Sequence, residues 1–401
     1  MTADDGSGAE GAAQVIDTSD FDFHDDGLDG LFDTYRQMHA GCPVGRSERL
    51  GGFTYLAKLE DIFAAEQNPA IWSVRPSMLL PSFATDTPLI PIDIDPPDHN
   101  AYRRILLPLF TPKAVEELTP GMRELARGLA QSIVDGETDD ACAAFARPMP
   151  LIVFSRLCGF PEADWPKFDR WIDDIVYERT RDLPRAKASA DAVFAYFDDL
   201  LRRRAEGEPT SDDILGILIQ AEVQGRRLTH DELISYCYLL FLAGLDTTAW
   251  AIRASLWYLA RNPAAQQALR DDRSLIPAAA EEFLRTMSPV QGMARTCLAD
   301  TTVRGTEIKA GERVVLLFGA GNRDPEVFDQ PDEIRFDRTK NRHLAFGGGI
   351  HRCLGSNLGR RELVVAIEEF LDVVPTFEAG DLDEPWHGVG PLTLRLAGAS
   401  S

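Results

Sequence analysis

Apolar side chains recur at helical spacing over most of the middle of the chain. Between about residues 100 and 285, segments with this period are joined by short stretches rich in Pro, Gly and Asp. Apolar residues at every third or fourth position indicate helices that bury one face. The clearest of these segments are residues 112–134, 163–177 and 186–205.

Alternation typical of β-strands is confined to short segments. These are residues 53–58, 301–321 and 392–398. Each is only long enough for small sheets. No internal repeat and no stretch resembling an interdomain linker interrupts the chain. The pattern therefore predicts a mainly α chain with small β-sheets, folded as one large domain.

The longest predicted helix runs from Thr229 to about Arg261. Thr229 and Glu232 have the spacing of a capping box, and the Asn-Pro pair at 262–263 ends the segment. At ~1.5 Å per residue this helix is about 50 Å long, enough to cross the molecule. Its middle is apolar on nearly every side, which predicts that it is buried.

Two residues in the middle of this helix are unfavourable there. Gly244 costs about 1 kcal/mol in a helix interior, and Asp246 costs more if it is buried without a partner. One interpretation is a close helix contact at Gly244, with Asp246 paired to a distant arginine. The other is that Ala243 and Gly244 let a flat ligand approach while Asp246 and Thr247 supply an acid and a hydroxyl. Thr247 can also donate to the carbonyl of Ala243 and loosen the helix.

Charge limits the classes of partner. The chain has 401 residues, of which 44% are hydrophobic and 26% charged, and its net charge is −23. A strongly acidic protein is not attracted to phosphate backbones or to anionic lipid. We therefore expect neither nucleic acid nor a membrane as a partner.

The start of the chain has a different composition from the rest. Residues 1–30 carry many acidic residues and no Lys or Arg, amid Gly, Ala and Ser. We expect roughly the first fifteen to be disordered, residues 1–30 to be a partly flexible segment, and residues 31–401 to form the folded domain. This start lacks a signal peptide, and no run of about 18 apolar residues follows, so we expect a cytoplasmic protein.

The six cysteines are widely scattered and include no C-x-x-C pair. Neither a disulfide framework nor a zinc knuckle is indicated. Cys353 differs from the other five because it lies in a glycine-rich stretch, AFGGGIHRCLGS, at residues 345–356. A phosphate-binding loop would need Lys followed by Ser or Thr after the glycines, and this stretch has neither. A nucleophilic Cys353 with His351 as its base remains open on these residues.

A metal-binding Cys353 gains support from the residues that follow it. The apolar positions Leu363, Ile367, Phe370 and Leu371 share one helical face before Pro375. Cys353 therefore lies just before or at a helix N-terminus, where the helix dipole favours a thiolate. A single cysteine is a poor zinc or iron–sulfur site, but it suits haem iron, which needs one proximal thiolate. The glycines would permit a tight turn and close contact with a flat cofactor.

The cysteine loop also resembles a known signature. Phe346, Gly349, Cys353 and Gly355 reproduce F-x-x-G-x-x-x-C-x-G, the haem-loop pattern of the cytochrome P450 superfamily. The resemblance continues through AGLDTT in the long helix, EEFLR at 281–285 and NRDPEVF at 322–328, and it covers nearly the whole chain after residue 30. It implies a single-domain cytochrome P450 fold in which haem lies between the long central helix and the cysteine loop.

The resemblance also implies a set of cofactor contacts. Cys353 is expected to be the axial thiolate of haem b. The haem propionates are expected to bind His99, Arg103, Arg295 and His351, because buried carboxylates need cationic donors. The remaining contacts with the cofactor are expected at Ala243, Gly244, Phe346, Gly347 and Gly355.

The expected reaction follows from the same resemblance. O₂ is activated with two electrons and two protons, and one oxygen atom enters an apolar substrate. Asp246 is expected to relay protons from solvent, and Thr247 to hold hydrogen bonds to the oxygen. By position in the family, the substrate pocket is expected at Leu239, Leu242, Ala243, Val290, Met293 and residues 77–83. Arg75 is either an anchor for a carboxylate or a solvated side chain.

The pair Glu282 and Arg285 is expected to stabilise the scaffold on the proximal side of the haem. In the family a further arginine joins this pair. Here the segment PDEIRFDR offers both Arg335 and Arg338 for that place.

Electrons are expected from outside the chain, because 401 residues leave no room for a fused flavin or iron–sulfur domain. We expect a separate ferredoxin with its NAD(P)H-dependent reductase, and a monomeric enzyme. A basic island supports the ferredoxin, because residues 338–361 contain no Asp or Glu. Its cations are Arg338, Lys340, Arg342, Arg352, Arg360 and Arg361.

Two other functions remain open on the sequence. One is a haem-thiolate enzyme that uses peroxide or catalyses a non-oxygenating reaction such as isomerisation or dehydration. The pair of Asp246 and Thr247 argues against it, since delivery of protons to O₂ is the most natural use of such a pair. The other is a haem-binding sensor without catalysis.

Overall fold

A computed structural model describes residues 17–24, 28–82, 87–206, 212–380 and 390–397. Most of these residues are helical. The helices are α1 (Leu28–Ala40), α2 (Leu59–Glu66), α3 (His99–Leu106), α4 (Pro112–Val134), α5 (Pro148–Cys158), α6 (Trp165–Ile172), α7 (Leu183–Ala205), α8 (Ile214–Gln220), α9 (His230–Leu245), α10 (Thr247–Arg261), α11 (Pro263–Asp271), α12 (Ile276–Met287), α13 (Phe318–Gly321) and α14 (Ser356–Val373).

The strands are short, and most of them join one mixed sheet with the order β1-β2-β9-β6-β3. Within it β2 and β9 are parallel and the other neighbours are antiparallel. Three two-stranded sheets complete the β structure of the described residues. The strands are β1 (Val44–Ser47), β2 (Phe53–Leu56), β3 (Trp72–Ser73), β4 (Glu222–Val223), β5 (Arg226–Arg227), β6 (Met293–Cys297), β7 (Thr301–Val303), β8 (Thr306–Ile308), β9 (Arg313–Leu316), β10 (Phe377–Ala379) and β11 (Leu394–Leu396).

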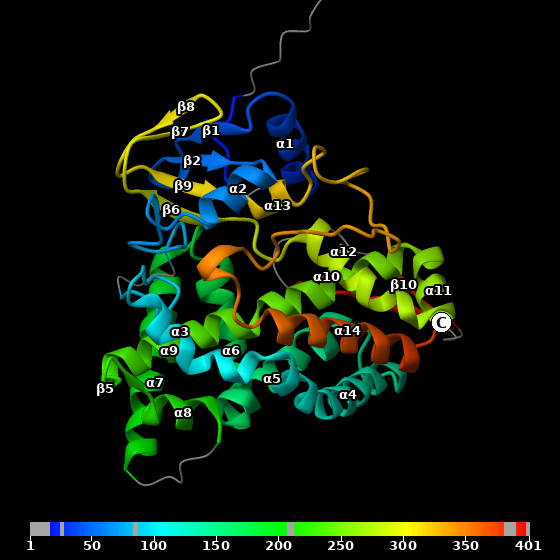
Figure 1. Ribbon diagram of the computed structural model, residues 1–401. Coiled ribbons are helices and arrows are strands. Elements are labelled where there is room, and N and C mark those ends of the chain that lie inside the picture. The colour runs from blue at the N-terminus through cyan, green and yellow to red at the C-terminus, as the bar shows by residue number, and fades with distance from the viewer. Residues whose placement is uncertain (1–16, 25–27, 83–86, 207–211, 381–389, 398–401) are drawn as a thin grey trace, which may run out of the picture.

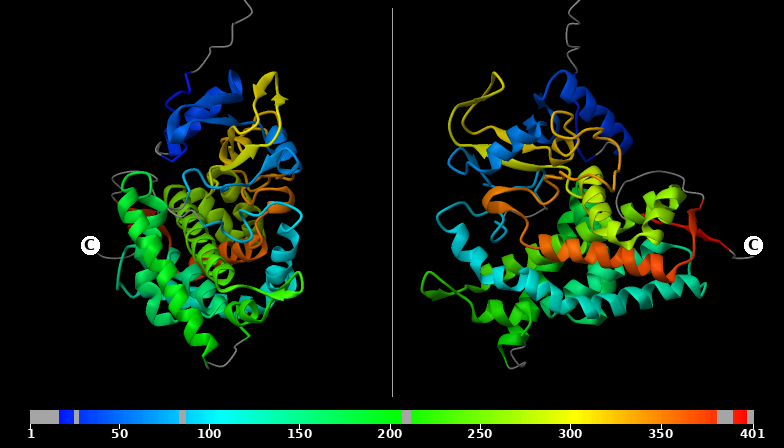
Figure 2. Two further views of the ribbon diagram at one scale, coloured as in Figure 1. Left: turned by 90° about the vertical axis from the view of Figure 1, so that its left-hand side faces the viewer. Right: turned by 45° about the vertical axis from the view of Figure 1, so that its right-hand side comes forward.

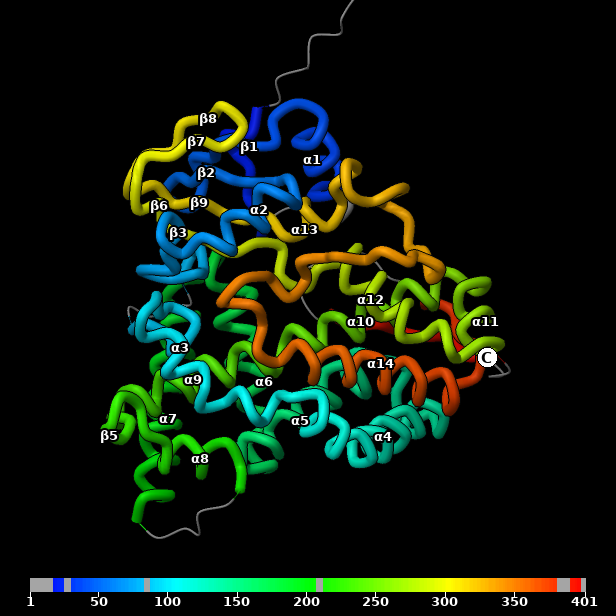
Figure 3. Tube along the Cα trace, in the orientation of Figure 1, coloured from blue at the N-terminus to red at the C-terminus, as the bar shows by residue number. Residues whose placement is uncertain are grey.

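The mixed sheet lies at one end of the molecule and the helices form the rest, as Figures 1 and 2 show. Helix α14 runs between α4, α10 and α12, and α9 packs against α5 and α7. Figure 3 traces the loop before α14, in orange, as it descends from the sheet end of the molecule into α14. One large cluster of buried apolar side chains joins these helices, and a smaller one underlies the sheet. The expected class, mainly α with small sheets, is confirmed.

Most of the expected elements form close to their predicted bounds. Residues 112–134 are α4, and residues 186–205 lie within α7. The expected helix at 163–177 is α6 followed by one π-helical turn at Asp173–Tyr177. The expected strand region at 301–321 is only partly extended, because residues 318–321 form the short helix α13.

The long helix is interrupted in the middle. The capping box of Thr229 and Glu232 is present, but α9 ends at Leu245 and α10 begins at Thr247. The Thr247 hydroxyl donates to the Ala243 carbonyl at 3.2 Å, as the sequence suggested. The expected helical span is therefore present but interrupted at one residue, Asp246, next to the threonine whose side chain competes for the helix backbone.

Two further observations concern the chain as a whole. The segment His230–Arg261 is long and apolar enough to cross a membrane, but 56% of its most apolar window is buried inside the protein. Near the start, residues 17–24 pack on the sheet, where Phe21 and Phe23 are buried against Phe53. The segment expected to be disordered, residues 1–15, lies outside the described residues.

Candidate active site

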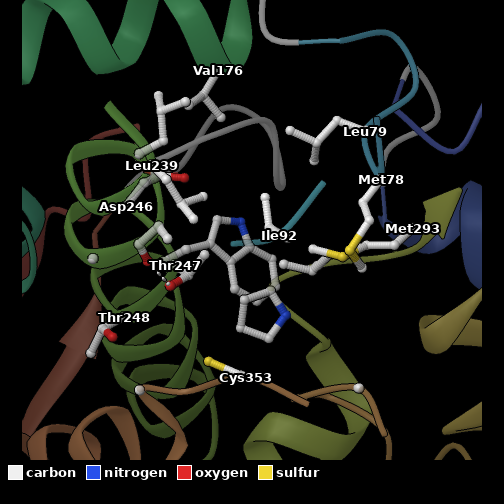
Figure 4. A pocket seen from close by; sticks show the side chains of 18 of the residues that line it. Met78, Leu79, Ile92, Val176, Leu239, Asp246, Thr247, Thr248, Met293 and Cys353 are labelled. Atoms are coloured by element: carbon white, nitrogen blue, oxygen red, sulfur yellow. Dashed lines mark hydrogen bonds between the residues drawn. The ribbon is translucent and has the colours of Figure 1, made fainter. Parts of the chain in front are cut away.

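A cavity of about 750 Å³ lies between the break of α9 and α10 and the loop that carries Cys353. Figure 4 shows Cys353 at the bottom of the cavity and Asp246 and Thr247 on a helix at its left, next to Leu239, with Ile92 in the middle and Met78 and Met293 at the right. The structure brings most of the expected site residues to this cavity. Those that line it are His99, Arg103, Leu239, Leu242, Ala243, Gly244, Asp246, Thr247, Val290, Met293, Phe346, Gly347, His351, Cys353 and Gly355.

The loop before α14 holds Cys353 by its own backbone. Gly347 and Gly349 adopt φ values of 60° and 57°, so the chain makes the tight turn expected of them. The N–H of Cys353 donates to the carbonyl of Phe346 at 2.8 Å. Burial raises the pKa of the Cys353 thiol, and the Gly355 N–H and nearby arginines oppose that rise. Cys353 precedes the first residue of α14 by a few positions, as expected.

The glycines serve a second purpose that the sequence did not indicate. A Cβ on Gly349 would lie 2.0 Å from the carbonyl oxygen of Glu66, and one on Gly348 would lie 2.6 Å from its carboxylate. The close approach at Gly348 and Gly349 is therefore between the loop and the end of α2. Glu66 itself is buried, and one of its carboxylate oxygens has no hydrogen-bond partner among the described residues.

Four of the expected propionate ligands gather at one corner of the site. The rings of His99 and His351 are 4.3 Å apart, and both nitrogens of His99 and Nε2 of His351 lack hydrogen-bond partners within the described chain. Arg295 does not line the cavity but lies next to this corner, 2% exposed and 3.9 Å from Glu66. Burial, followed by the positive charges of His99, Arg295 and Arg103, lowers the pKa of His351 to about 2.

This corner fits an anionic group. Buried nitrogens without partners, in a positive potential that Glu66 and Asp95 only partly offset, are stabilised by carboxylates that accept from them. The residues present therefore fit the two propionates of the haem that the resemblance implies.

The opposite wall carries the break in the central helix. Asp246 lies there, and its Oδ1 accepts a hydrogen bond from the Tyr177 hydroxyl at 2.6 Å. Burial raises the pKa of Asp246 to about 6 although this bond opposes the rise. The hydrogen-bond partner of Asp246 is thus a tyrosine from the π-helical turn. One interpretation of the sequence had instead paired Asp246 with a distant arginine.

Gly244 matches the packing interpretation of the sequence. It lines the cavity, but a Cβ at this position would lie 2.3 Å from the ring of Phe154 on α5. A side chain there would be directed at α5, so the glycine is needed for the approach of two helices.

The pair on α12 has its third member. Glu282 binds Arg285 at 2.8 Å and Arg338 at 2.9 Å, and all three side chains are nearly inaccessible to solvent. Arg335 contributes its backbone N–H to Glu282, while its side chain pairs with Asp329 and Asp337 at the surface. Arg338 therefore completes the cluster.

The basic island divides into paired and exposed cations. Arg338, Arg360 and Arg361 bind Glu282, Glu281 and Glu116. Lys340, Arg342 and Arg352 are exposed, and none of the three forms an ion pair within the described part of the chain. Half of the island thus remains available to a partner. Arg75 is exposed and does not line the cavity.

Sequence reasoning missed several residues of the site. Tyr177 falls at the end of an amphipathic segment, and Glu66 ends α2, so neither position carried a signal of function. Met78 was included only as part of residues 77–83, and Ile92 and Val176 were not expected at all. No cluster of three or more His, Cys, Asp or Glu side chains suitable for a bare metal ion occurs among the described residues.

Comparisons with known proteins agree with this geometry. The family model described as Cytochrome P450 matches residues 157–373, more than half of the chain. A mycinamicin IV hydroxylase/epoxidase of Micromonospora griseorubida is 38% identical over 72% of this chain and 73% of its own. A steroid C26-monooxygenase of Mycolicibacterium smegmatis is 33% identical over 90% of this chain and 88% of its own. The crystal structure of CYP109E1 from Bacillus megaterium with testosterone has a TM-score of 0.83 at 29% identity, covering 92% of this chain and 98% of the other.

Proposed function

This chain belongs to the cytochrome P450 family, and from this premise we propose that it oxidises a hydrophobic organic molecule with electrons from a separate ferredoxin. The named relatives of this chain are hydroxylases and monooxygenases. The protein is a haem-thiolate monooxygenase, an oxidoreductase that uses O₂. The observation that supports the finer proposal is the apolar cavity between Cys353 and the pair of Asp246 and Thr247.

The proposed cofactor contacts come from the loop that carries Cys353 and from the positive corner beside it. Cys353 is the thiolate ligand, and His99, Arg103, Arg295 and His351 hold the propionates. When bound, haem with a thiolate ligand supplies the electron-transfer and O₂ chemistry that amino-acid side chains lack. The positive corner supports this assignment, as does the lack of a hydrogen-bond partner among the described residues for both nitrogens of His99 and for Nε2 of His351.

The proposed roles of the distal residues concern protons and water. Asp246 exchanges protons, which suits a carboxyl with a pKa of about 6 because both of its ionisation states are accessible near neutral pH. The Thr247 hydroxyl donates to the Ala243 carbonyl. In the proposed reaction the same hydroxyl would form hydrogen bonds with O₂. Apolar side chains such as Leu239 and Met293 hold the substrate and exclude water.

The proposed substrate is a small to medium hydrophobic compound. The cavity has an apolar middle, built by Met78, Leu79, Ile92, Leu239 and Met293. Relatives named for steroid and mycinamicin oxidation, and a structural neighbour that holds testosterone, favour a compound of that size.

The proposed electron donor is an acidic ferredoxin, served by an NAD(P)H-dependent reductase in the cytoplasm. Lys340, Arg342 and Arg352 are exposed around the loop that carries Cys353, in a protein whose net charge is −23. Opposite charges on two partners speed their encounter and orient it. The Arg352→Glu variant is expected to slow reduction about 10-fold at low salt, with little effect at high salt. Equal rates in wild type, Arg352→Glu and the control Lys187→Glu on α7 would argue against this docking site.

The overall proposal is tested by ligand binding and by labelled oxygen. Hydrophobic candidates are titrated into the purified haem protein, and displacement of water from the haem is followed in the visible spectrum. A compound that binds is then supplied with ferredoxin, its reductase and ¹⁸O₂. We expect one labelled oxygen atom in the product and NAD(P)H consumption that depends on O₂. Product formed only with added peroxide, or no consumption with any binding compound, would overturn the proposal.

A further inference from the structure

Asp246 has one hydrogen-bonded partner that the proposed mechanism does not use. The hydroxyl of Tyr177 donates to its Oδ1 at 2.6 Å, a short bond of the kind formed with charged acceptors. Tyr177 ends the π-helical turn Asp173–Tyr177, where the extra residue of the turn changes the direction of the side chains that follow. Both residues line the cavity.

We propose that Tyr177 is the positioning residue that holds the Asp246 carboxyl at the break between α9 and α10, by donating its hydroxyl hydrogen to that carboxyl. The inference rests on the proposed role of Asp246 in proton exchange. The backbone of Asp246 is held by the helical turns on either side, with the Trp250 N–H donating to its carbonyl at 2.9 Å, whereas its carboxyl is held by a short bond from a different element, the π-helical turn. Val176, which precedes Tyr177, lies close to Asp246 on the same side of the cavity (Figure 4).

Charged groups from three other positions also act on Asp246. Arg147 and Arg179 favour its ionised form, and Asp173 disfavours it. Burial is the larger influence and raises the pKa of Asp246 to about 6, whereas the Tyr177 hydroxyl is the strongest group that lowers it. Because Tyr177 donates to the charged form, its removal shifts the carboxyl toward the protonated form at neutral pH.

Two of these neighbours belong to a group of ion pairs that reaches the surface. Arg147 pairs with Asp173 at 2.7 Å and with Asp169 at 2.6 Å, and both of these carboxylates are 42% exposed. Arg147 and Asp173 also line the cavity, so Tyr177 holds the Asp246 carboxyl on the side of the cavity that carries these partly exposed charges.

A direct test follows the Asp246 carboxyl by infrared spectroscopy. The pH-dependent band of the protonated carboxyl is identified as the one lost in Asp246→Asn, using the haem-loaded protein without substrate. In Tyr177→Phe we expect the midpoint of this band to rise by about one to two pH units, since a hydrogen bond to a charged group is worth roughly that much. The matched control is Tyr196→Phe, which breaks another bond from tyrosine to carboxylate, the 2.7 Å bond to Asp164 outside the cavity.

The result that overturns the inference is an unchanged midpoint in Tyr177→Phe, or an equal shift in Tyr196→Phe. A second measurement separates this outcome from failure of the proposed function. The fraction of NAD(P)H that ends in product is measured against pH in Tyr177→Phe and in Asp246→Asn. We expect the profile of Tyr177→Phe to move to higher pH by the same interval as the infrared midpoint. If Asp246→Asn keeps the full product yield while the infrared shift is present, Tyr177 still positions Asp246 and only the proton-exchange role fails.

Discussion

The two walls of the cavity are built in different ways. The wall that carries Cys353 is a glycine-rich loop fixed by its own backbone, by α2 behind it and by buried ion pairs around α12. The wall that carries Asp246 is a helix that breaks, with a glycine seated on Phe154 and an acid held by one tyrosine. Groups on the first wall are held from several directions, whereas the Asp246 carboxyl accepts one hydrogen bond among the described residues, from Tyr177, and is otherwise influenced by the charges of Arg147, Arg179 and Asp173.

This difference indicates what each wall must do. A ligand to iron has to stay at one place, and a densely bonded loop with buried counter-charges keeps it there. A group that exchanges protons has to change its hydrogen bonds in every cycle, which a single contact permits. We therefore expect substitutions on the Cys353 wall to have larger effects on stability than those on the Asp246 wall.

The largest effect is expected at the cysteine itself. In Cys353→Ser the thiolate is replaced by a hydroxyl that stays protonated at neutral pH, so the strongly red-shifted band of the reduced carbon-monoxide complex should disappear. Turnover should fall to background in an assay of substrate oxidation. The control is Cys42→Ser, since the Cys42 thiol lies far from Cys353 in the sequence and donates to the carbonyl of Val44 at 3.2 Å, a bond that a hydroxyl can also make. Survival of the red-shifted band would show that Cys353 is not the ligand.

A large loss of stability is expected in Glu282→Ala. This change leaves Arg285 and Arg338 buried without their carboxylate, which typically costs about 3–5 kcal/mol. The free energy of unfolding is measured in urea by circular dichroism and by loss of the haem absorbance. Arg335→Ala serves as the comparison, because its side chain pairs at the surface and should cost less than about 1 kcal/mol. Equal losses in the two variants would contradict the assignment of Arg338 as the third member.

Gly349→Ala is expected to cost about 2–4 kcal/mol. The new Cβ would meet a backbone oxygen at 2.0 Å, and φ at this position is 57°, so both crowding and backbone strain oppose it. The measurement is the same unfolding titration, together with haem content after purification. A variant as stable as wild type would mean that the loop and α2 separate easily, and it would contradict the expectation that the Cys353 wall is the more sensitive to substitution.

The smallest effect is expected for the matched substitution on the other wall, Gly244→Ala. Its Cβ would meet the Phe154 ring at 2.3 Å, which a side chain can relieve by moving. Alanine also gains about 1 kcal/mol of helix propensity, which offsets part of a crowding cost of about 1–3 kcal/mol. A net loss of about 0–2 kcal/mol is expected in the unfolding titration. If Gly244→Ala lost more free energy of unfolding than Gly349→Ala, the Asp246 wall would be the more sensitive of the two to substitution.

The features that could be predicted from the sequence are those that depend on the spacing of residues near one another in the chain. The cysteine loop, the helix after it and the segment 112–134 each follow from residues close together in the chain. The choice between Arg335 and Arg338 could not be predicted in this way. Both lie at suitable distances along the chain, and only the path of the segment decides which side chain turns inward. At the break the sequence indicated a local loosening by Thr247, but the apolar pattern continues through Asp246 and so did not indicate that the helix would be interrupted there.

The residues that were missed come from segments far apart in the sequence. Glu66 lies 282 positions before Gly348, which it contacts, and Tyr177 lies 69 positions before Asp246, to which it donates. Such contacts depend on how the helices pack. A single sequence shows which face of each helix is apolar, but it does not show which other helix that face contacts. The first strand of the sheet and β6 were missed for a related reason, because strands this short carry too few alternating positions.

The packed start of the chain has a practical consequence for where the folding unit is cut. By composition the first thirty residues form a tail, and a shortened protein could be designed to begin at residue 31. Such a truncation would strip Phe21 and Phe23 from the sheet, at about 1.5–3 kcal/mol for each buried ring. It would also remove Phe23 and His24 from the lining of the cavity. The minimal unit therefore begins no later than residue 17, and shorter versions would report on a larger and less enclosed binding space than the protein has.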